Sequence, residues 1–297
     1  MKDIETKLRR LLLDRKRLEN LLLREKERRG VSKESLVFLG MANIAEYSWC
    51  AMQSLFKNRR DEVDFFGAYL QDRILYSFKL GHIKRLPKRS LAWLDIGNDI
   101  TFEDVECLLK SHSRSSLVSE VSFTVIGDGM PVLVDADGLS SDECRSSLQR
   151  QDPKLRGELL HRVKAERYPS IRWHFVWNKY VVVGIPDGIT DRFVYEYKTT
   201  RKLGLLRYIK PVAHNQANLY GFFFKRDEKR VQVYIVDSDR TETWQDKLDE
   251  KQAENILKKF RAVDAGDAPL PPKGWKCKRC EFRQECPLNQ QRVTTSD

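Results

Sequence analysis

The feature that most constrains the fold is a group of three cysteines near the C-terminus. Cys277, Cys280 and Cys286 lie within ten residues, with the spacing C-x2-C-x5-C. Such crowding favours a metal or cluster site over a disulfide, which a reducing cytosol would also disfavour. Three thiolates need a fourth ligand, so the fold must bring this tail to a distant segment. The candidates for the fourth ligand are Cys50, Cys107, Cys144 and the histidines.

Composition narrows the class of protein. The chain has 297 residues, 41% hydrophobic and 33% charged, which is typical of one large or two small globular domains. The net charge of +11 favours a polyanion partner such as nucleic acid, although a basic surface kept for solubility would look the same. No apolar run approaches the roughly 18 residues that span a membrane. The N-terminus is too charged for a secretory signal peptide, so we expect a cytoplasmic protein without membrane contact.

The first half of the chain predicts helices around a region of mixed character. Residues 1–30 indicate one helix with a net charge of +5, and 32–57 indicate another, with Ser32 as its N-cap. The first helix either packs on its own domain or docks on a partner or DNA. Its apolar positions have heptad-like spacing. They are Ile4, Leu8, Leu11, Leu18 and Leu22. Residues 60–150 read as an insertion, helical near 103–110 and strand-like at 121–126 and 131–134.

The second half alternates helices and strands, which predicts a mixed α/β core. A Pro-rich break at 266–272 precedes the cysteine-rich tail. One helix opens with Pro211 near its first turn. The predicted helices are 154–167, 211–225 and 246–262, and the predicted strands are 171–177, 179–185, 192–198 and 230–236.

The strongest catalytic pattern is a pair of carboxylates on a predicted hairpin. Asp187 follows a Val-rich strand, and Glu196 and Lys198 share one face of the next strand. A turn near 188–191 would bring Asp187 beside Glu196. Two carboxylates can hold a hard divalent cation, and a lysine beside them supplies a point charge for phosphate chemistry. Taken alone, the pattern fits an ordinary polar hairpin with a surface Glu–Lys pair equally well.

Together these three residues resemble the D…(D/E)-x-K signature of the restriction-endonuclease-like nuclease superfamily. Gly157 and His161 resemble the G-x-x-x-H helix that precedes this hairpin in RecB-like nucleases. Gln216 and Tyr220 resemble the Q-x-x-x-Y helix that follows it. The order and spacing of the three motifs are fairly specific. The resemblance implies a RecB-type mixed central sheet flanked by helices.

The resemblance also implies roles for individual residues. Asp187, Glu196, His161 and the backbone carbonyl of Tyr197 would bind Mg²⁺ or Mn²⁺. Lys198 would complete the catalytic set. Gln216 and Tyr220, one helical turn apart, would hold the DNA backbone or the active-site water network. For these two residues, helix packing on the sheet is the alternative.

The cysteines resemble those of the iron–sulfur RecB-like exonucleases, notably the CRISPR-associated exonuclease family. In that family one cysteine precedes the nuclease motifs and three follow them. The match implies that Cys50, Cys277, Cys280 and Cys286 hold a 4Fe–4S cluster, with zinc as the alternative metal. Cys107 and Cys144 would be free thiols. A metal held by Cys50 and the tail cysteines would close a loop of more than 200 residues. Its binding would therefore contribute to the free energy of folding.

From these patterns we expect three segments. They are a basic helix at 1–30, a nuclease domain at 31–272 with an insertion at about 60–150, and a cluster-binding tail at 273–297. The expected activity is exonucleolytic cleavage of single-stranded DNA ends, in the processing of fragments for CRISPR spacer acquisition. An integrase or helicase of that system could dock on 1–30. The alternatives are a repair or viral nuclease of the same chemistry, and a DNA-binding assembly subunit with an idle nuclease site.

Overall fold

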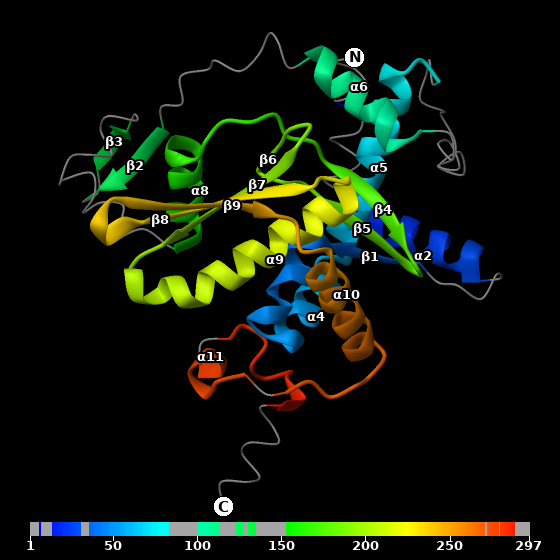
Figure 1. Ribbon diagram of the computed structural model, residues 1–297. Coiled ribbons are helices and arrows are strands. Elements are labelled where there is room, and N and C mark those ends of the chain that lie inside the picture. Colours follow the sequence, from blue (N-terminus) through cyan, green and yellow to red (C-terminus); the bar gives the residue numbers. More distant parts are fainter. Residues whose placement is uncertain are drawn as a thin grey trace, which may run out of the picture.

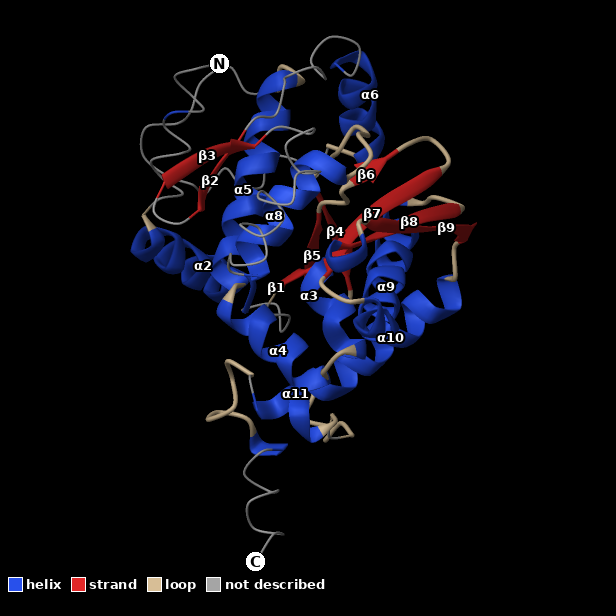
Figure 2. Cartoon of the chain, turned by 90° about the vertical axis from the view of Figure 1, so that its left-hand side faces the viewer, coloured by secondary structure: helices blue, strands red, loops and turns tan. Residues whose placement is uncertain are grey.

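The computed structural model describes Thr6 and residues 14–30, 36–82, 100–112, 123–127, 130–134, 153–270, 272–278 and 280–288. These residues form a mixed α/β fold in which helices surround two sheets (Figure 1). The predicted α/β class is therefore confirmed. Seen from the side in Figure 2, α8 (Pro153–Lys164) and α9 (Leu206–Phe224) both lie close to β7 (Phe193–Thr200).

Two of the sheets are mixed. The first has the order β1-β5-β4, with β1 parallel and β4 antiparallel to the central strand. Its strands are β1 (Val37–Gly40), β4 (Trp173–Trp177) and β5 (Tyr180–Gly184). The second has the order β6-β7-β8-β9, and only its central pair is parallel. Its strands are β6 (Gly188–Ile189), β7 (Phe193–Thr200), β8 (Glu228–Ile235) and β9 (Arg240–Lys247). A parallel pair needs a crossover connection, which α9 supplies between β7 and β8.

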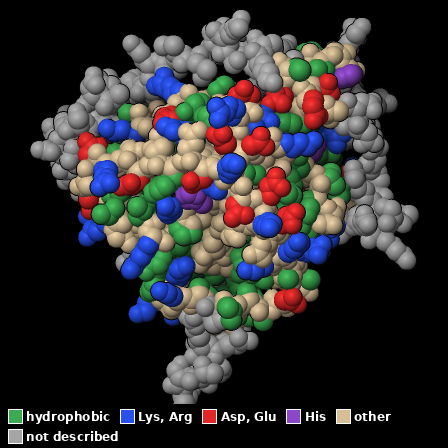
Figure 3. Space-filling model, in the orientation of Figure 1, with side chains coloured by type: hydrophobic (Ala, Val, Ile, Leu, Met, Phe, Trp, Pro, Cys, Tyr) green, Lys and Arg blue, Asp and Glu red, His purple; other side chains and the backbone are tan. Residues whose placement is uncertain are grey.

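The remaining elements complete the helical layers. A separate hairpin consists of β2 (Phe123–Gly127) and β3 (Met130–Val134). The other helices are α2 (Arg15–Gly30), α3 (Met41–Ala45), α4 (Ala51–Arg60), α5 (Glu62–Lys79), α6 (Phe102–His112), α10 (Glu250–Asp264) and α11 (Gly274–Lys278). Short 3-10 turns are η1 (Glu46–Ser48), η4 (Leu203–Leu205) and η5 (Val236–Ser238). On the face shown in Figure 3, basic side chains are spread among acidic and uncharged ones.

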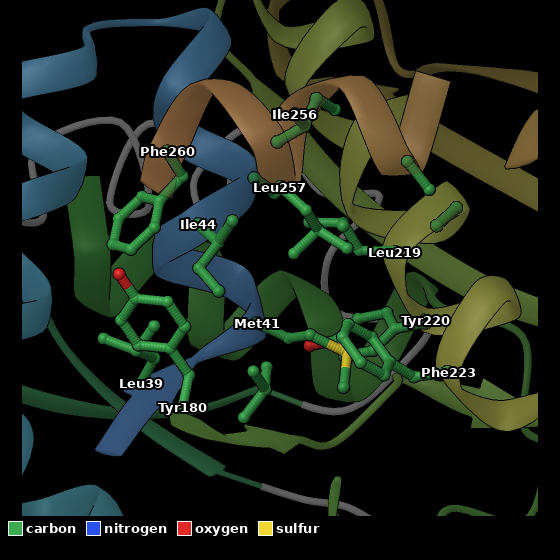
Figure 4. Close-up of a cluster of buried hydrophobic side chains, with 14 of the residues drawn as sticks. Leu39, Met41, Ile44, Tyr180, Leu219, Tyr220, Phe223, Ile256, Leu257 and Phe260 are labelled. Atoms are coloured by element: carbon green, nitrogen blue, oxygen red, sulfur yellow. The ribbon is translucent and has the colours of Figure 1, made fainter. Parts of the chain in front are cut away.

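The main core lies between the first sheet and the helices α3, α9 and α10 (Figure 4). Met41, Ile44 and Tyr180 are fully buried in it. Burying a side chain of this size contributes about 1.5–3 kcal/mol, so this cluster holds both halves of the chain together. Tyr220 of α9 and Leu257 of α10 complete it from the other side.

Four segments differ from the sequence-based predictions. The predicted helix at 32–57 is wrong at Val37–Gly40, which forms β1, because these apolar residues pair with the buried β5. Ser32 lies outside the described residues. Pro211 lies inside α9, which begins at Leu206, so it removes a hydrogen bond in the helix instead of opening it. Neither β9 nor α5 was predicted. The other predicted helices and strands from 154 to 262 are confirmed within a few residues.

The N-terminal helix packs on its own domain over the residues that are described. Leu18 and Leu22 of α2 are 3% and 5% exposed and contact a cluster that includes Phe66 and Leu70 of α5. Lys26 of α2 also forms an ion pair with Glu62. This apolar face is therefore covered, and a partner docking on α2 would have to use its charged face. Ile4, Leu8 and Leu11 lie outside the described residues.

Candidate active site

The β6–β7 hairpin brings the two predicted carboxylates together. Its register pairs Gly188 with Tyr195, so Asp187 lies opposite Glu196, one position further along. The Asp187 carboxylate also accepts a hydrogen bond of 2.8 Å from the backbone N–H of Tyr197. The backbone ladder and this bond together position Asp187. The predicted hairpin geometry is present.

Glu196 is fully buried with only one of its carboxylate oxygens satisfied. Its Oε1 accepts a hydrogen bond from Lys198 Nζ, whereas its Oε2 has no partner among the described residues. Burial raises the pKa of Glu196 to about 8, and the charge of Asp187 adds to this effect while Lys198 opposes it. A buried carboxylate with an unsatisfied oxygen costs free energy, which a cation bound at that oxygen would recover.

The charges of the hairpin support one another. Burial alone would lower the pKa of Lys198, but the carboxylates of Glu196 and Asp187 outweigh it and raise that pKa. Burial alone would raise the pKa of Asp187, but the neighbouring His161 and Lys198 bring it below its ordinary value. Lys198 therefore stays a cation and Asp187 an anion at neutral pH.

His161 reaches the same site from α8. Its Nε2 lies 3.3 Å from Asp187 Oδ1, without the alignment of a hydrogen bond, and its ring contacts Tyr197. This placement agrees with the predicted G-x-x-x-H helix. The glycine of that motif is not required sterically, because a Cβ at Gly157 would meet Thr199 Oγ1 at an ordinary distance of 3.5 Å.

The Q-x-x-x-Y pair lies on the buried side of α9. Gln216 Nε2 donates a hydrogen bond of 3.2 Å to Tyr220 Oη. Tyr220 is 2% exposed and belongs to the main core (Figure 4), so the packing role is present. Burial raises the pKa of Tyr220 well above its ordinary value, and the charges of Glu196 and Asp187 contribute. The negative charges of both carboxylates therefore help to keep the Tyr220 hydroxyl protonated. A role of this hydroxyl in holding DNA or water stays a prediction.

The donor atoms at this site fit a divalent cation in part. Glu196 Oε2 and His161 Nε2 are buried atoms without hydrogen-bond partners, and Asp187 adds a second carboxylate. Within the described ranges, no group of three or more His, Cys, Asp or Glu side chains is arranged to hold a metal ion. Mg²⁺ is usually bound through one or two carboxylates and keeps several water ligands, so Asp187 and Glu196 would suffice as its side-chain ligands.

All four predicted cluster ligands line one cavity. Cys50 precedes α4 in an extended conformation, at the helix boundary rather than within the helix as expected. Cys277, Cys280 and Cys286 face the same cavity from the tail. Exposed Cys107 does not belong to its lining, and Cys144 lies outside the described residues. No disulfide joins the described cysteines. Within the described ranges, no three of them are arranged to hold a metal ion.

The walls of the cysteine cavity suit a group that is kept from water. Met52, Phe56, Phe282 and Leu288 surround the thiols. Burial raises the pKa of Cys50, and the neighbouring Cys280 and Cys286 raise it further. A neutral Cys50 thiol is therefore favoured without a metal, whereas a bound metal would deprotonate it.

Side-chain contacts also tie the tail to the segment around Cys50. Lys276 Nζ donates a hydrogen bond of 2.8 Å to the carbonyl oxygen of Trp49. Arg60 forms an ion pair of 2.5 Å with Glu281. The rings of Phe56 and Phe282 stack with centroids 5.5 Å apart. The segment 49–60 and the cysteine tail therefore meet here.

Sequence reasoning missed one acidic residue near the active site. Glu46 forms an ion pair of 2.7 Å with Lys57, and its charge contributes to the raised pKa of Lys198. Glu46 lies four residues before Cys50, so one short segment lies near both the hairpin and the cysteine cavity. Nothing in its local pattern indicates this. Two tryptophans differ in their access to a bound strand, since Trp173 is only 4% exposed whereas Trp275 is 44% exposed.

Comparisons with known proteins leave the family open. No protein-family model matches the chain, and no curated protein matches it. The crystal structure of SSO0001 is similar at 20% sequence identity and a TM-score of 0.35, over 62% of this chain and 96% of that one. Similarity at this level carries no argument about fold or function. Among the described helices, none is long and apolar enough to cross a membrane.

Proposed function

We propose that the chain is a divalent-metal-dependent DNA exonuclease of the RecB-like type that acts on single-stranded ends. The observation that carries this proposal is the unsatisfied, buried oxygen of Glu196, which lies opposite Asp187 and beside Lys198. A surface Glu–Lys pair, the competing interpretation of this hairpin, would leave the glutamate in water. A fully buried glutamate instead suits a site that is completed by a ligand.

Each residue has a role in this proposal. Asp187, Glu196, His161 and the carbonyl of Tyr197 would hold Mg²⁺ or Mn²⁺. When bound, the cation would supply charge for the scissile phosphate and lower the pKa of a water molecule. Lys198 stays charged and presents its ammonium group where negative charge develops on phosphorus oxygens. The side chains of His161 and Asp187 are 40% and 25% exposed, so a nucleic acid strand can approach this side.

We propose, as a second element, that the four cysteines of the cavity hold a 4Fe–4S cluster. Their shared cavity and its apolar walls support a buried metal group, and the resemblance favours iron–sulfur over zinc. Iron, sulfide and zinc content of protein purified without oxygen tests this. Cys50→Ser should abolish the metal content, and Cys107→Ser is the matched control because Cys107 is exposed on α6. Zinc in place of iron would overturn the assignment of the metal.

The biological process in which this nuclease acts is proposed from the resemblance of its motifs and cysteines. Processing of DNA fragments for CRISPR spacer acquisition is the setting we favour, with an integrase or helicase as partner. A repair or viral nuclease has the same site chemistry. A DNA-binding assembly subunit with an idle site would bind DNA and leave it intact.

Cleavage of end-labelled DNA tests the proposed activity. The protein is incubated with single-stranded and duplex DNA, labelled at either end, with Mg²⁺, Mn²⁺ or a chelator. Glu196→Gln should remove metal-dependent cleavage. Glu158→Gln is the matched control, because Glu158 is exposed on α8 one turn before His161. Equal cleavage by the wild type and Glu196→Gln would contradict the proposal.

A further inference from the structure

We propose that the start of α9 carries a binding surface for single-stranded nucleic acid, separate from the metal-binding residues. Leu203, Leu205 and Trp275 would contact bases, and Lys202 and Arg207 would contact phosphates. This inference rests on the proposed function, because it concerns the strand that enters or leaves the active site. It adds the positioning of that strand to the chemistry of the hairpin.

The location of this surface follows from the chain. Strand β7 carries Glu196 and Lys198 and ends at Thr200, and η4 begins at Leu203. Five Cα–Cα steps therefore join Lys198 to Leu203. At no more than about 3.5 Å per residue, their Cα atoms are within roughly 18 Å of each other. A strand of a few nucleotides covers that distance, so a strand held at η4 can reach the hairpin.

The side chains of this segment are unusually exposed for their type. Leu203 is 57% and Leu205 is 42% exposed, and they belong to the same short turn. Trp275 is 44% exposed and contacts Tyr208 of α9, with ring centroids 5.2 Å apart. Several large apolar side chains left in water on adjoining elements indicate a contact surface, whereas a single one would need no explanation.

The charge of the segment selects the partner. The sequence from 201 to 210, RKLGLLRYIK, has four Lys and Arg residues and no acidic residue. Arg201 lies 3.6 Å from Asp237, but neither Lys202 nor Arg207 has an ion pair within the described part of the chain. The Arg207 guanidinium lies over the ring of Tyr208 at 4.8 Å. Figure 3 shows hydrophobic and basic side chains side by side at the lower left, where Figure 1 draws the start of α9.

Apolar surfaces flanked by unpaired cations match single-stranded nucleic acid, whose bases need stacking partners and whose phosphates need positive charge. The surface is also supported from below. Trp49, Tyr208 and Trp275 contact one another, and Lys276 Nζ lies 4.2 Å from the ring centroid of Trp49. These contacts hold Trp275 in place, so stacking on it requires little ordering of the side chain.

Binding of a fluorescent oligothymidylate of about 15 nucleotides tests the surface directly. The measurement uses Glu196→Gln protein, so that DNA is bound without hydrolysis. Adding Leu203→Ser and Leu205→Ser should weaken binding by about tenfold or more, because the two changes remove the apolar contacts that these leucines make with bases. The matched control is Leu270→Ser, because Leu270 is 93% exposed and lies outside this surface. Thermal melting verifies that each variant is folded.

The charged residues are tested by salt dependence. Changing Lys202 and Arg207 to Ala should reduce the slope of log K against log salt by about 1.4, since each phosphate contact on a single strand contributes about 0.7. Vesicles of phosphatidylserine and phosphatidylcholine test the competing class of surface. Vesicle binding that is lost in the Leu203→Ser, Leu205→Ser protein, with DNA binding unchanged, would overturn the proposal in favour of a membrane surface.

Cleavage assays separate this inference from the proposed function. With Glu196 intact, the two leucine changes should slow cleavage of long single strands and leave a nitrophenyl ester of thymidine monophosphate unaffected, because it cannot reach η4. Unchanged binding and unchanged cleavage of long strands would refute the surface and leave the nuclease proposal standing. DNA binding that depends on the leucines, without cleavage in any metal, would support the surface and contradict the nuclease.

Discussion

The hairpin site and the cysteine cavity are built in different ways. Glu196 and Lys198 lie on β7, and the backbone ladder of the hairpin brings Asp187 opposite Glu196. In the described part of the cysteine tail, the five-residue α11 is short, and side-chain contacts tie the tail to the segment around Cys50. Side-chain contacts with solvent-exposed partners are individually weak. The comparison teaches that backbone pairing holds the first site together, whereas the tail would gain most of its stability from a bound metal.

Removal of the cluster ligand should have the largest effect. Cys50→Ser should abolish metal content and leave the tail open to trypsin, since metal binding supplies the folding energy that weak contacts do not. The helix α4 should stay protected, because Ala51, Met52 and Leu55 are buried in the main core. Mass spectrometry of the digestion products gives the answer. A tail that stays protected in Cys50→Ser would break the comparison.

Loss of the buried carboxylate should come next. Glu196→Gln should lower cleavage by at least about a hundredfold, the range for one electrostatic contact at a reacting centre. Its melting temperature should change little, because the raised pKa leaves Glu196 with little charge to lose near neutral pH, and the amide oxygen of glutamine can still accept a hydrogen bond from Lys198. Melting in the absence of divalent cations measures this. A clear fall in melting temperature would show that the hairpin is held by this charge rather than by its backbone.

Lower pH should reduce the free energy of unfolding through a buried histidine on β4, whether or not a metal is bound. Burial on β4, with the charge of Arg73, lowers the pKa of His174 to about 3 from its ordinary 6.5. Between these values the unfolded chain binds more protons than the folded one, so stability falls as the pH drops. One such group contributes up to about 1.4 kcal/mol per pH unit.

His174→Phe should therefore flatten the dependence of unfolding free energy on pH below about 6.5. Urea unfolding at a series of pH values measures the slope. His82→Asn is the control, because His82 is exposed and should keep the slope of the wild type. An unchanged slope in His174→Phe would show that this histidine is protonated in the folded protein.

The smallest effect should come from the ion pair across the tail. Arg60 and Glu281 are each about half exposed, at 47% and 49% of their side chains. A double-mutant cycle with alanine at both positions should give a coupling below about 1 kcal/mol, as for other exposed pairs. The cycle is measured by thermal or urea unfolding. A larger coupling would mean that side-chain contacts hold the tail in place without help from a bound metal.

Local patterns were sufficient for the parts of the protein that depend on nearby residues. Alternation along 192–198 places Glu196 and Lys198 on one face of β7, and the turn residues at 188–191 predict the hairpin. Spacing of four places Gln216 and Tyr220 on one face of α9, where they are hydrogen-bonded. Three crowded cysteines predict a ligand site in the tail. In each case the interactions span a few residues, so the sequence records them directly.

Long-range pairing was decided only in the tertiary structure. Val37–Gly40 is a strand because β5 lies beside it, and a four-residue apolar segment has no period that separates strand from helix. Glu46 lies near Lys198, and Cys50 joins the tail cysteines, because α3 packs on both α9 and α10 while α4 packs on α10. The contacts of Trp49, Tyr208 and Trp275 arise from three distant segments. Which surfaces meet depends on packing of the whole core, and no local pattern encodes that choice.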